Sequence, residues 1–206
     1  RDFTPELIRA YRNLDVLADH LHLPVQSGNN RILKAMRRGY TVEDYFRLVD
    51  ALKAEVPGIA LSTDIIVGFP GETDREFRET LRLMERVGFD NSYMFVYSPR
   101  PGTAAAELAD TVPENVKKDR LQATIELQKS ITEKNGGKYV GGEVEVLIEG
   151  GSARDGADFK GRSPHYWMVH FAGGGGALKP GDRVPVKVRD VAGHVLLGSY
   201  SPPRAG

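Results

Sequence analysis

Cysteine is absent from the 206 residues of the sequence. Its absence excludes a disulfide scaffold, a cysteine-ligated zinc or iron–sulfur site, and a thiol nucleophile within the chain. It suits a reducing compartment, and we expect a cytoplasmic protein. Net charge is also missing, because 28 Lys and Arg residues balance 28 Asp and Glu residues. The total charge therefore gives no sign of a strongly basic nucleic-acid binder or of an acidic tail.

Long hydrophobic runs are missing as well. No apolar run approaches the roughly 18 residues of a membrane helix, and the first residues do not have the pattern of a signal peptide. We therefore expect no membrane partner. Apolar residues still make up 40% of the sequence, which is enough to build a core and excludes wholesale disorder.

Glycine is scarce in the first two thirds of the chain and abundant in the rest. Residues 1–134 hold 7 of the 23 glycines, and residues 135–206 hold the other 16. The change follows a long helical pattern and predicts a domain boundary. We expect one domain at 1–135, a second at 136–201 and a short tail at 202–206.

Strand and helix patterns alternate in the first domain. Thr41 to Asp44 and Thr73 to Glu76 have the spacing of helix N-caps with an acidic residue at the third position. Such alternation is typical of parallel βα units. The expected strands are 21–26, 59–69 and 93–97; the expected helices are 4–11, those opening at Thr41 and Thr73, and one from Pro113 to about Lys134 with Val116, Leu121, Ile125 and Ile131 as apolar positions.

Three such units are too few to close a barrel. The sequence also starts just before a helix, and we interpret the chain as part of a larger protein. The second domain has a different sequence pattern, with five short alternating runs separated by glycine-rich turns. These runs, 143–148, 159–162, 166–171, 183–189 and 194–200, predict a small, partly open all-β barrel of the OB-like type.

Side-chain alternation divides the second strand into an apolar face and a face with polar groups. Asp64 lies on the polar face with Ser62, Ile66 and Gly68. A carboxyl group is costly to bury without a partner, so Asp64 is either a structural hydrogen-bonding group or a ligand contact near the strand's carboxyl end. The turn at 66–73 is either a tight βα connection or a nucleotide contact, and it lacks the Gly-Lys-Ser/Thr of a Walker A loop.

Two groups of basic residues are candidates for phosphate contacts. One recurs at helical spacing, so that most members would share a face, with an ordinary solvated helix face as the alternative: Arg31, Lys34, Arg37 and Arg38. The other lies beside the aromatic residues Tyr166 and Trp167, a mixture suited to base stacking, with ordinary barrel surface as the alternative: Lys160, Arg162, Arg183, Lys187 and Arg189. The histidines are scattered, so we expect no metal site.

Four blocks of the sequence carry a family resemblance. LHLPVQSG at 21–28, NRILKAMRRGYT at 30–41, STDIIVGFPGET at 62–73 and YSPRPGT at 97–103 resemble the radical-SAM methylthiotransferases. The similarity is strongest to the branch that modifies tRNA, the MiaB type. The segment from Lys138 to Tyr200 resembles the TRAM domain of that family, a small RNA-binding barrel.

The resemblance implies the second half of a partial (βα)₆ TIM-like radical-SAM barrel followed by an OB-like TRAM barrel. It implies S-adenosylmethionine (SAM) and two [4Fe–4S] clusters, with the ligand cysteines upstream of this chain, which alone would be inactive. The implied reaction adds a methylthio group to C2 of N6-isopentenyladenosine-37. The implied partners are the tRNA anticodon stem-loop and a sulfur donor for the auxiliary cluster, while the oligomeric state stays open.

The resemblance also implies roles for individual residues. Gln26 and Ser27 would make polar contacts to SAM, Ile66 and Gly68 would line its adenine, and Tyr97 and Ser98 would supply backbone contacts. Asp64, the candidate catalytic residue, would orient SAM or the target base. The general pattern Gly-x-Ile-x-Gly-x-x-Glu fits loosely, because Asp64 replaces its first glycine and Glu72 comes one position late.

Two other functions remain open at this point. One is a methylthiotransferase of the ribosomal-protein S12 branch (RimO-like), which usually differs from the tRNA branch around the LPVQSG and STD segments. A non-catalytic RNA-binding module would use the same basic residues without chemistry. An unrelated βα-barrel enzyme is a weaker third hypothesis, because the sequence presents no other catalytic constellation.

Overall fold

The computed structural model describes residues 3–154, 156–175 and 178–202. The chain divides into two compact units, one with residues up to Leu17 and Leu21–Ile131, the other with Ala18–His20 and the residues from Thr132 onward. The division falls inside one long helix. The boundary predicted at 135/136 lies further along the same helix and stays a prediction, and residues 203–206 of the predicted tail lie outside the described part. In that part, no helix is both long and apolar enough to cross a bilayer.

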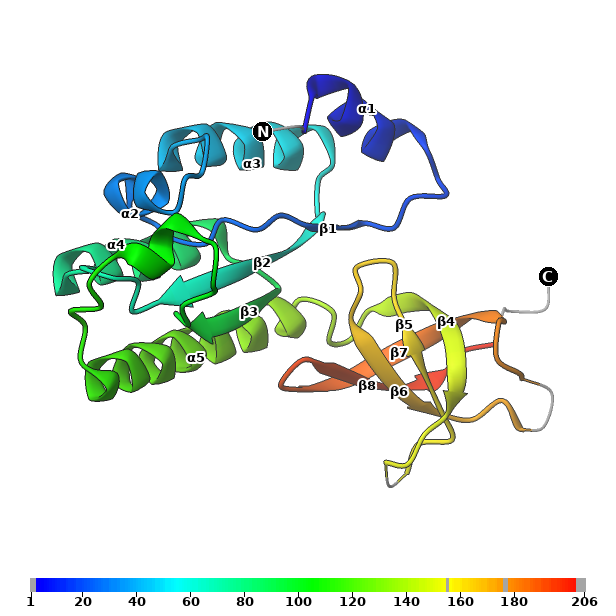
Figure 1. The fold of residues 1–206 in the computed structure, drawn as a ribbon. Coiled ribbons are helices and arrows are strands. Elements are labelled where there is room, and N and C mark those ends of the chain that lie inside the picture. The colour runs from blue at the N-terminus through cyan, green and yellow to red at the C-terminus, as the bar shows by residue number, and fades with distance from the viewer. Residues whose placement is uncertain (1–2, 155, 176–177, 203–206) are drawn as a thin grey trace. The chain divides into compact units, whose positions relative to one another are not determined.

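The first unit is an α/β unit with a three-stranded sheet in the order β1-β2-β3 (Figure 1). β2 and β3 run parallel, with Asp64 beside Tyr93 and Ile66 beside Phe95. The elements are α1 (Pro5–Asn13), β1 (His20–His22), α2 (Asn30–Ala35), α3 (Val42–Glu55), β2 (Ala60–Val67), α4 (Asp74–Val87), β3 (Asn91–Val96), the short 3₁₀ helix η1 (Ala104–Glu107) and α5 (Glu114–Gly137).

Local sequence signals set the starts of two helices. The Thr41 side chain accepts from the Asp44 amide, and the Asp44 carboxylate accepts from the Thr41 amide, which caps α3 from both sides. Thr73 and Glu76 make the same reciprocal pair at the start of α4. Both predicted capping boxes are confirmed. Gly88 ends α4 in the left-handed conformation, with φ 67°.

The two faces of β2 differ in composition, as predicted. Leu61, Thr63, Ile65 and Val67 are buried on the face that packs into the core of the α/β unit. Asp64 and Ile66 point to the other face and are half-buried. The sheet thus presents a partly polar face near the carboxyl ends of its strands, where parallel α/β proteins bind ligands.

The strand predicted at 21–26 is shorter in the structure, because β1 ends at His22. Pro24 has no amide hydrogen, and the amide of Val25 donates to the Thr63 hydroxyl at 3.0 Å instead of to a strand carbonyl. Tyr45 and Tyr40 donate to the carbonyls of Leu23 (2.8 Å) and Val25 (3.1 Å). The Leu23 amide still donates to the Ser62 carbonyl at 2.8 Å; side chains then replace the backbone pairing until the bridge from Gln26 to Ile65.

Of the expected apolar positions of α5, Leu121 and Ile131 are partly buried and pack against the core, and the helix also buries a polar stripe. Ile125 is exposed, and Val116 is only half-buried. The buried stripe in the α/β unit recurs at helical spacing: Lys117, Arg120, Thr124 and Gln128. These side chains satisfy polar groups at the ends of neighbouring elements; Gln128, for example, donates to the Phe89 carbonyl (2.8 Å) and accepts from the Ser92 hydroxyl (2.9 Å).

The second unit is a five-stranded barrel, closed rather than partly open, with strand order β4-β5-β6-β8-β7. The parallel pairing of β6 with β8 completes the ring. The strands are β4 (Glu143–Gly151), β5 (Phe159–Arg162), β6 (Met168–Ala172), β7 (Arg183–Ala192) and β8 (Val195–Tyr200). The barrel core is apolar and contains the fully buried Trp167, Phe171 and Leu196.

Candidate functional site

A pocket of about 620 Å³ opens in the α/β unit at the carboxyl ends of the strands. It brings together six of the residues predicted from the sequence: Gln26, Arg38, Asp64, Ile66, Tyr97 and Ser98. The remaining lining comes from Met36, Phe69, Phe95, Val96, Arg100, Thr103 and Ala105. The wall therefore combines apolar and aromatic surface with a carboxylate, an amide and two guanidinium groups, a typical composition for a small-molecule site.

Gln26 has an unusual backbone in this pocket. Its φ is 71°, in the left-handed region that side-chain-bearing residues seldom adopt. Two hydrogen bonds to β2 hold it there, from its amide to the Asp64 carbonyl and from the Ile66 amide to its own carbonyl, both at 2.9 Å. Among the described residues, its side-chain amide has no hydrogen-bond partner. Strained residues of this kind are concentrated at ligand sites.

Asp64 has a histidine next to it on the same face of the sheet. The Nε2 atom of His22 lies 3.5 Å from the Asp64 carboxylate, and its Nδ1 atom lies 2.9 Å from the Ser62 hydroxyl. The Tyr93 ring meets the His22 ring edge-on, with centroids 5.7 Å apart. The carboxylate is therefore oriented from one side and open to the pocket on the other.

Tyr97 lines the pocket with its side chain, whereas its amide already donates to the Val67 carbonyl at 2.9 Å. Its ring meets Phe69 edge-on, with centroids 5.1 Å apart. The buried Tyr97 hydroxyl has no hydrogen-bond partner in the described part of the chain. An unpaired buried hydroxyl is costly, so the Tyr97 side chain is a better candidate contact than its backbone amide.

Ser27 and Gly68 lie beside the pocket lining rather than on it. Ser27 is fully buried and its hydroxyl lies 3.5 Å from that of Thr80 on α4. Gly68 has φ 70° and its amide donates to the Glu72 carboxylate at 2.8 Å. A Cβ at Gly68 would lie 2.5 Å from Cγ of Lys117, so only glycine fits there.

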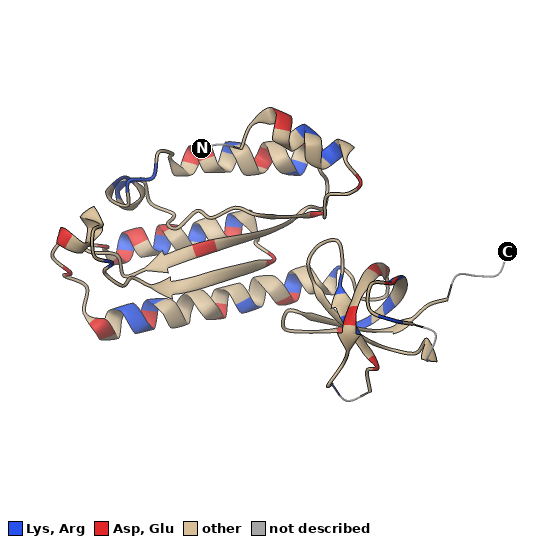
Figure 2. Cartoon of the chain, turned by 45° about the vertical axis from the view of Figure 1, so that its right-hand side comes forward, with Lys and Arg blue, Asp and Glu red and all other residues tan. Residues whose placement is uncertain are grey.

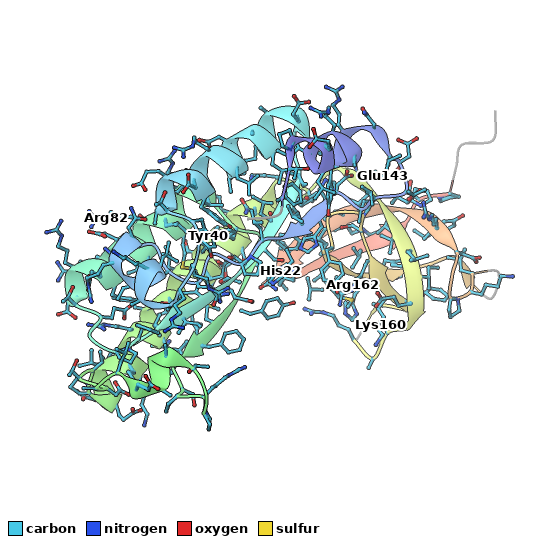
Figure 3. The ribbon with its side chains drawn as sticks, turned by 45° about the horizontal axis from the view of Figure 1, so that its top comes forward. His22, Tyr40, Arg82, Glu143, Lys160 and Arg162 are labelled. Carbon is cyan, nitrogen blue, oxygen red and sulfur yellow. The ribbon has the colours of Figure 1, made fainter. Side chains whose placement is uncertain are left out.

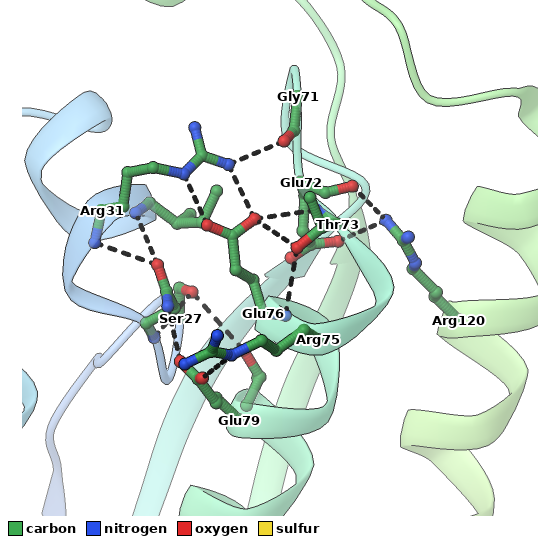
Figure 4. Close-up of polar contacts among 12 residues, drawn as sticks. Ser27, Arg31, Gly71, Glu72, Thr73, Arg75, Glu76, Glu79 and Arg120 are labelled. Carbon is green, nitrogen blue, oxygen red and sulfur yellow. Dashed lines mark hydrogen bonds and ion pairs between the residues drawn. The ribbon is translucent and has the colours of Figure 1, made fainter.

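Two arginines clamp the turn between β2 and α4 from opposite sides (Figure 4). Arg31 makes a bidentate pair with Glu76, at 2.5 and 2.7 Å, and donates to the Gly71 carbonyl at 2.7 Å. Arg120 of α5 donates to the carboxylate and the carbonyl of Glu72, at 2.9 and 3.0 Å. The turn beside the pocket is thereby fixed by charged hydrogen bonds.

The two clamped carboxylates have opposite pKa shifts. Hydrogen bonds from Arg31, followed by those from Thr73, lower the pKa of Glu76 to about 2. Glu72 has an almost fully buried side chain, and burial raises its pKa above the ordinary value, against the opposing effect of the Gly68 amide and Arg120. Removing Arg120 would leave Glu72 as an uncompensated buried acid.

The four basic residues at 31–38 do not share one helix face. α2 ends at Ala35, and Arg37 follows in the left-handed conformation with φ 57°. Arg31 is neutralised by Glu76, whereas Lys34, Arg37 and Arg38 are exposed and have no ion pair among the described residues. Only Arg38 lines the pocket. Figure 2 shows this short basic segment beside helices on which acidic and basic residues are interleaved.

The basic residues of the barrel are exposed or half-buried on its strands, and several have partners (Figure 3). Arg162 lies 4.1 Å over the Tyr166 ring and donates to Glu149 at 3.2 Å. Arg183 faces Glu145 at 3.6 Å, and Lys187 donates to the Gly141 carbonyl. Lys160 and Arg189 have no ion pair in the described part.

The aromatic residues beside them divide into core and surface. The prediction of Trp167 as a stacking surface is wrong, because its ring is fully buried in the barrel core. Tyr166 is 43% exposed, and its ring is stacked on the ring of His20, with centroids 4.8 Å apart.

Several residues that line or support the pocket were not predicted from the sequence. Phe95 and Arg100 belong to a strand and turn in which only Tyr97 and Ser98 had been singled out. Arg120 and Lys117 lie 40 or more residues after the turn that they support. Their spacing in the sequence is typical of the solvent-exposed face of an amphipathic helix. A usable signal was present in Glu72, an acid within an otherwise apolar and glycine-rich turn that required a distant cation.

The residues fit SAM better than they fit a metal cluster. The open Gln26 amide, the unpaired Tyr97 hydroxyl and the apolar Ile66 are suited to a ligand with an amino-acid end and an adenine. No cluster of three potential metal ligands occurs among the described residues, and the sequence has no cysteine for an iron–sulfur cluster. This chain therefore has no thiolate ligands for such a cluster.

Comparison with protein families resolves the fold. Residues 1–84 match the model of the radical SAM superfamily, and residues 137–200 match that of the TRAM domain. The chain is a radical-SAM protein with a TRAM domain. The superfamily implies SAM and a [4Fe–4S] cluster. The predicted fold class, a parallel α/β part of the radical-SAM type followed by a small β-barrel, is confirmed.

Several curated relatives of this radical-SAM protein carry the name tRNA-2-methylthio-N(6)-dimethylallyladenosine synthase. The protein of Moorella thermoacetica is 50% identical over 84% of this chain and 39% of its own length. Those of Thermoanaerobacter sp. and Thermobifida fusca are 46% and 45% identical over 96% of the chain, and 42% and 41% of their own lengths. The chain therefore spans about two fifths of the length of these relatives.

This chain is also similar to a solved structure, that of coproporphyrinogen III oxidase (HemN) from Escherichia coli, which is described as a radical SAM enzyme. The TM-score is 0.54 at 17% identity, and the match covers 93% of this chain and 45% of the other. This likeness supports the fold.

Proposed function

We propose that the whole protein containing this chain is a tRNA methylthiotransferase that acts on N6-isopentenyladenosine-37. The observation that carries the proposal is the pocket in which Gln26, Asp64, Ile66 and Tyr97 meet, on a chain 45–50% identical to synthases of that modification. SAM, cleaved at a [4Fe–4S] cluster, would supply the hydrogen abstraction at C2 that precedes sulfur insertion. The cysteines for this cluster and the auxiliary one would lie in a part of the protein outside this chain, which alone would be inactive.

Within the pocket, the chain's own residues would bind and orient. Gln26 has a free amide fixed by its backbone, and would hydrogen-bond to the amino-acid or sugar portion of SAM. Ile66 supplies apolar surface for the adenine of SAM. Asp64, oriented by His22, would position SAM or the target base. The fixed turn at 68–73 would hold this wall in place, through Ser27, Gly68 and the two arginine clamps.

The barrel would bind the anticodon stem-loop of the tRNA. Lys160 and Arg189 are exposed without ion pairs among the described residues, and Arg162 is stacked on the exposed Tyr166. Phosphate contacts from such residues, with an aromatic ring beside them, suit RNA. Arg183 and Lys187 extend the same chemistry along β7. A protein with this activity would work in the cytoplasm with a sulfur donor.

The test is activity of the whole protein, reconstituted with iron and sulfide and supplied with SAM. We expect a methylthio group on isopentenyladenosine-37 of tRNA, detected by mass spectrometry of the nucleosides. Modification of ribosomal protein S12 in place of tRNA would move the protein to the ribosomal branch. Salt-dependent tRNA binding without any modification would favour the RNA-binding module.

A further inference from the structure

We propose that Phe95, Arg38 and Arg100 form a nucleotide subsite in the pocket. Phe95 would stack on one unpaired base, and the two arginines would contact the phosphates on either side of that nucleotide. The proposal rests on the proposed function in one respect, namely that the ligand is RNA. It joins Arg38, a phosphate-contact candidate from the sequence, to Phe95 and Arg100, which neither the sequence pattern nor the turn beside the pocket explains.

Phe95 presents an aromatic ring to the pocket. Its side chain is 53% exposed although it lies on a strand of the sheet and lines the pocket. In the parallel register Phe95 lies beside Ile66, and Tyr93 lies beside Asp64, so these four side chains share one face. A large ring exposed next to an acid and an apolar side chain is suited to a planar base with polar edges.

The basic residues around the pocket differ in whether they have an ion-pair partner. Arg38 and Arg100 are exposed, line the pocket and have no ion pair among the described residues. Arg31, by contrast, is satisfied by Glu76 and Gly71. Asp64 is the only carboxylate in the pocket lining and already has His22 beside it. Two unpaired guanidinium groups thus remain for anionic groups of the ligand.

Aromatic surface decides between an RNA and an acidic peptide. Both ligands would attract Arg38 and Arg100, but a peptide carboxylate gains nothing from an exposed ring beside it. A nucleotide uses the ring and both cations at once, because its base stacks while its flanking phosphates pair. We therefore assign the subsite to a single unstacked nucleotide of single-stranded RNA.

Two RNA trinucleotides distinguish the stacking contact from the phosphate contacts. One has N6-dimethylallyladenosine in the middle, and the other has an abasic middle residue. Binding to the full 206-residue chain is measured by calorimetry at several salt concentrations. We expect Phe95→Ala to weaken binding of the first probe about tenfold, in the range of one base–aromatic stack, and to leave the abasic probe unchanged. Phe95→Tyr keeps a ring and should bind like the wild type.

The arginine variants have a different expected signature. Arg38→Gln and Arg100→Gln should weaken both probes alike, and each should lower the slope of log affinity against log salt by about 0.7. Arg82→Gln and Ile125→Ala are matched controls, because both residues are exposed on other helices of the same unit. Neither control should change the affinity or the slope.

Equal loss of both probes in Phe95→Ala would overturn the stacking assignment, as would no loss at all. Stronger competition by an acidic peptide than by the trinucleotide would overturn the choice of RNA. SAM binding by the whole protein is measured separately in the same variants. Failure of methylthio transfer with the variant effects intact would reject the proposed function and leave the nucleotide subsite standing.

Discussion

The α/β unit and the barrel build their interiors from different chemistry. Among the described residues, the barrel from β4 onward buries one polar residue, Ser163, around an apolar core. The α/β unit buries charged groups, including Glu72, Glu76, Lys117 and Arg120. These groups fix the turn beside the pocket, whereas the candidate RNA contacts of the barrel lie on its surface. The buried charged groups therefore lie in the unit that contains the candidate site, where they hold the turn beside the pocket in position.

The largest expected effect comes from removing a buried charge in the α/β unit. Arg120→Met leaves the almost fully buried Glu72 without its cation, and should lower the free energy of unfolding by about 3 to 5 kcal/mol. Urea unfolding followed by circular dichroism measures the change. Arg75→Met is the matched control, because Arg75 is 87% exposed and pairs with Glu79 at 3.4 Å. A loss below about 1 kcal/mol in Arg120→Met would show that the clamp is dispensable.

Truncating a buried apolar side chain tests the contribution of the apolar core to the stability of the barrel. Leu196 is fully buried among apolar side chains, and Leu196→Ala should cost about 2 to 5 kcal/mol. Trp167, the single tryptophan, reports on the barrel alone through its fluorescence. Leu196→Ala should shift the fluorescence transition, and Arg120→Met should leave it in place. Equal shifts in both variants would mean that the two units unfold as one.

Two glycines with positive φ separate backbone strain from close packing. Gly58→Ala, at φ 88° with nothing within 4 Å of the added Cβ, should cost about 1 kcal/mol from the left-handed conformation. Gly68→Ala adds the contact with Lys117 at 2.5 Å and should cost about 2 to 3 kcal/mol in total. Thermal unfolding of the two variants gives the difference. Equal losses of stability in the two variants would show that the close contact with Lys117 does not destabilise Gly68→Ala.

The smallest effect depends on pH. The pKa of Glu76 is lowered from 4.5 to about 2, so its pairing stabilises the fold above pH 4.5 and is lost as the pH falls toward 2. Because Arg31 is 55% exposed, we expect Arg31→Gln to cost about 1 kcal/mol at pH 7 and less than that at pH 2. NMR titration should show the Glu76 pKa rising toward 4.5. Arg75→Gln should leave that pKa unchanged, and a Glu76 pKa still near 2 in Arg31→Gln would contradict the pairing.

Sequence patterns predicted what depends on neighbours in the chain. Both capping boxes and the faces of β2 follow from residues two or three positions apart, and the structure confirms them. The neutralisation of Arg31 by Glu76 joins residues 45 positions apart and could not be predicted from a local run of cations. Trp167 was misassigned for the same reason, because closure of the barrel decides which aromatic ring is buried.

The buried polar stripe of α5 was not predicted from the sequence, for a different reason. Hydrophobic periodicity places apolar residues toward the core, but this helix packs against carbonyls and carboxylates at the ends of other elements. Its buried polar positions follow those partners, while Leu121, Leu127 and Ile131 pack against the apolar core. In the pocket, Gln26, Asp64 and Tyr97 were predicted from the family resemblance, whereas Phe95 and Arg100 became visible only in the structure.

The most direct test of the pocket as a SAM site is the affinity of the whole reconstituted protein for SAM in the variant Gln26→Gly. Glycine accepts φ 71° without strain, so the variant should unfold no more easily than the wild type while losing the amide that faces the ligand. We predict about tenfold weaker SAM binding with unchanged or higher stability, and no change in the control Arg82→Gln. Wild-type SAM affinity in Gln26→Gly would contradict the account.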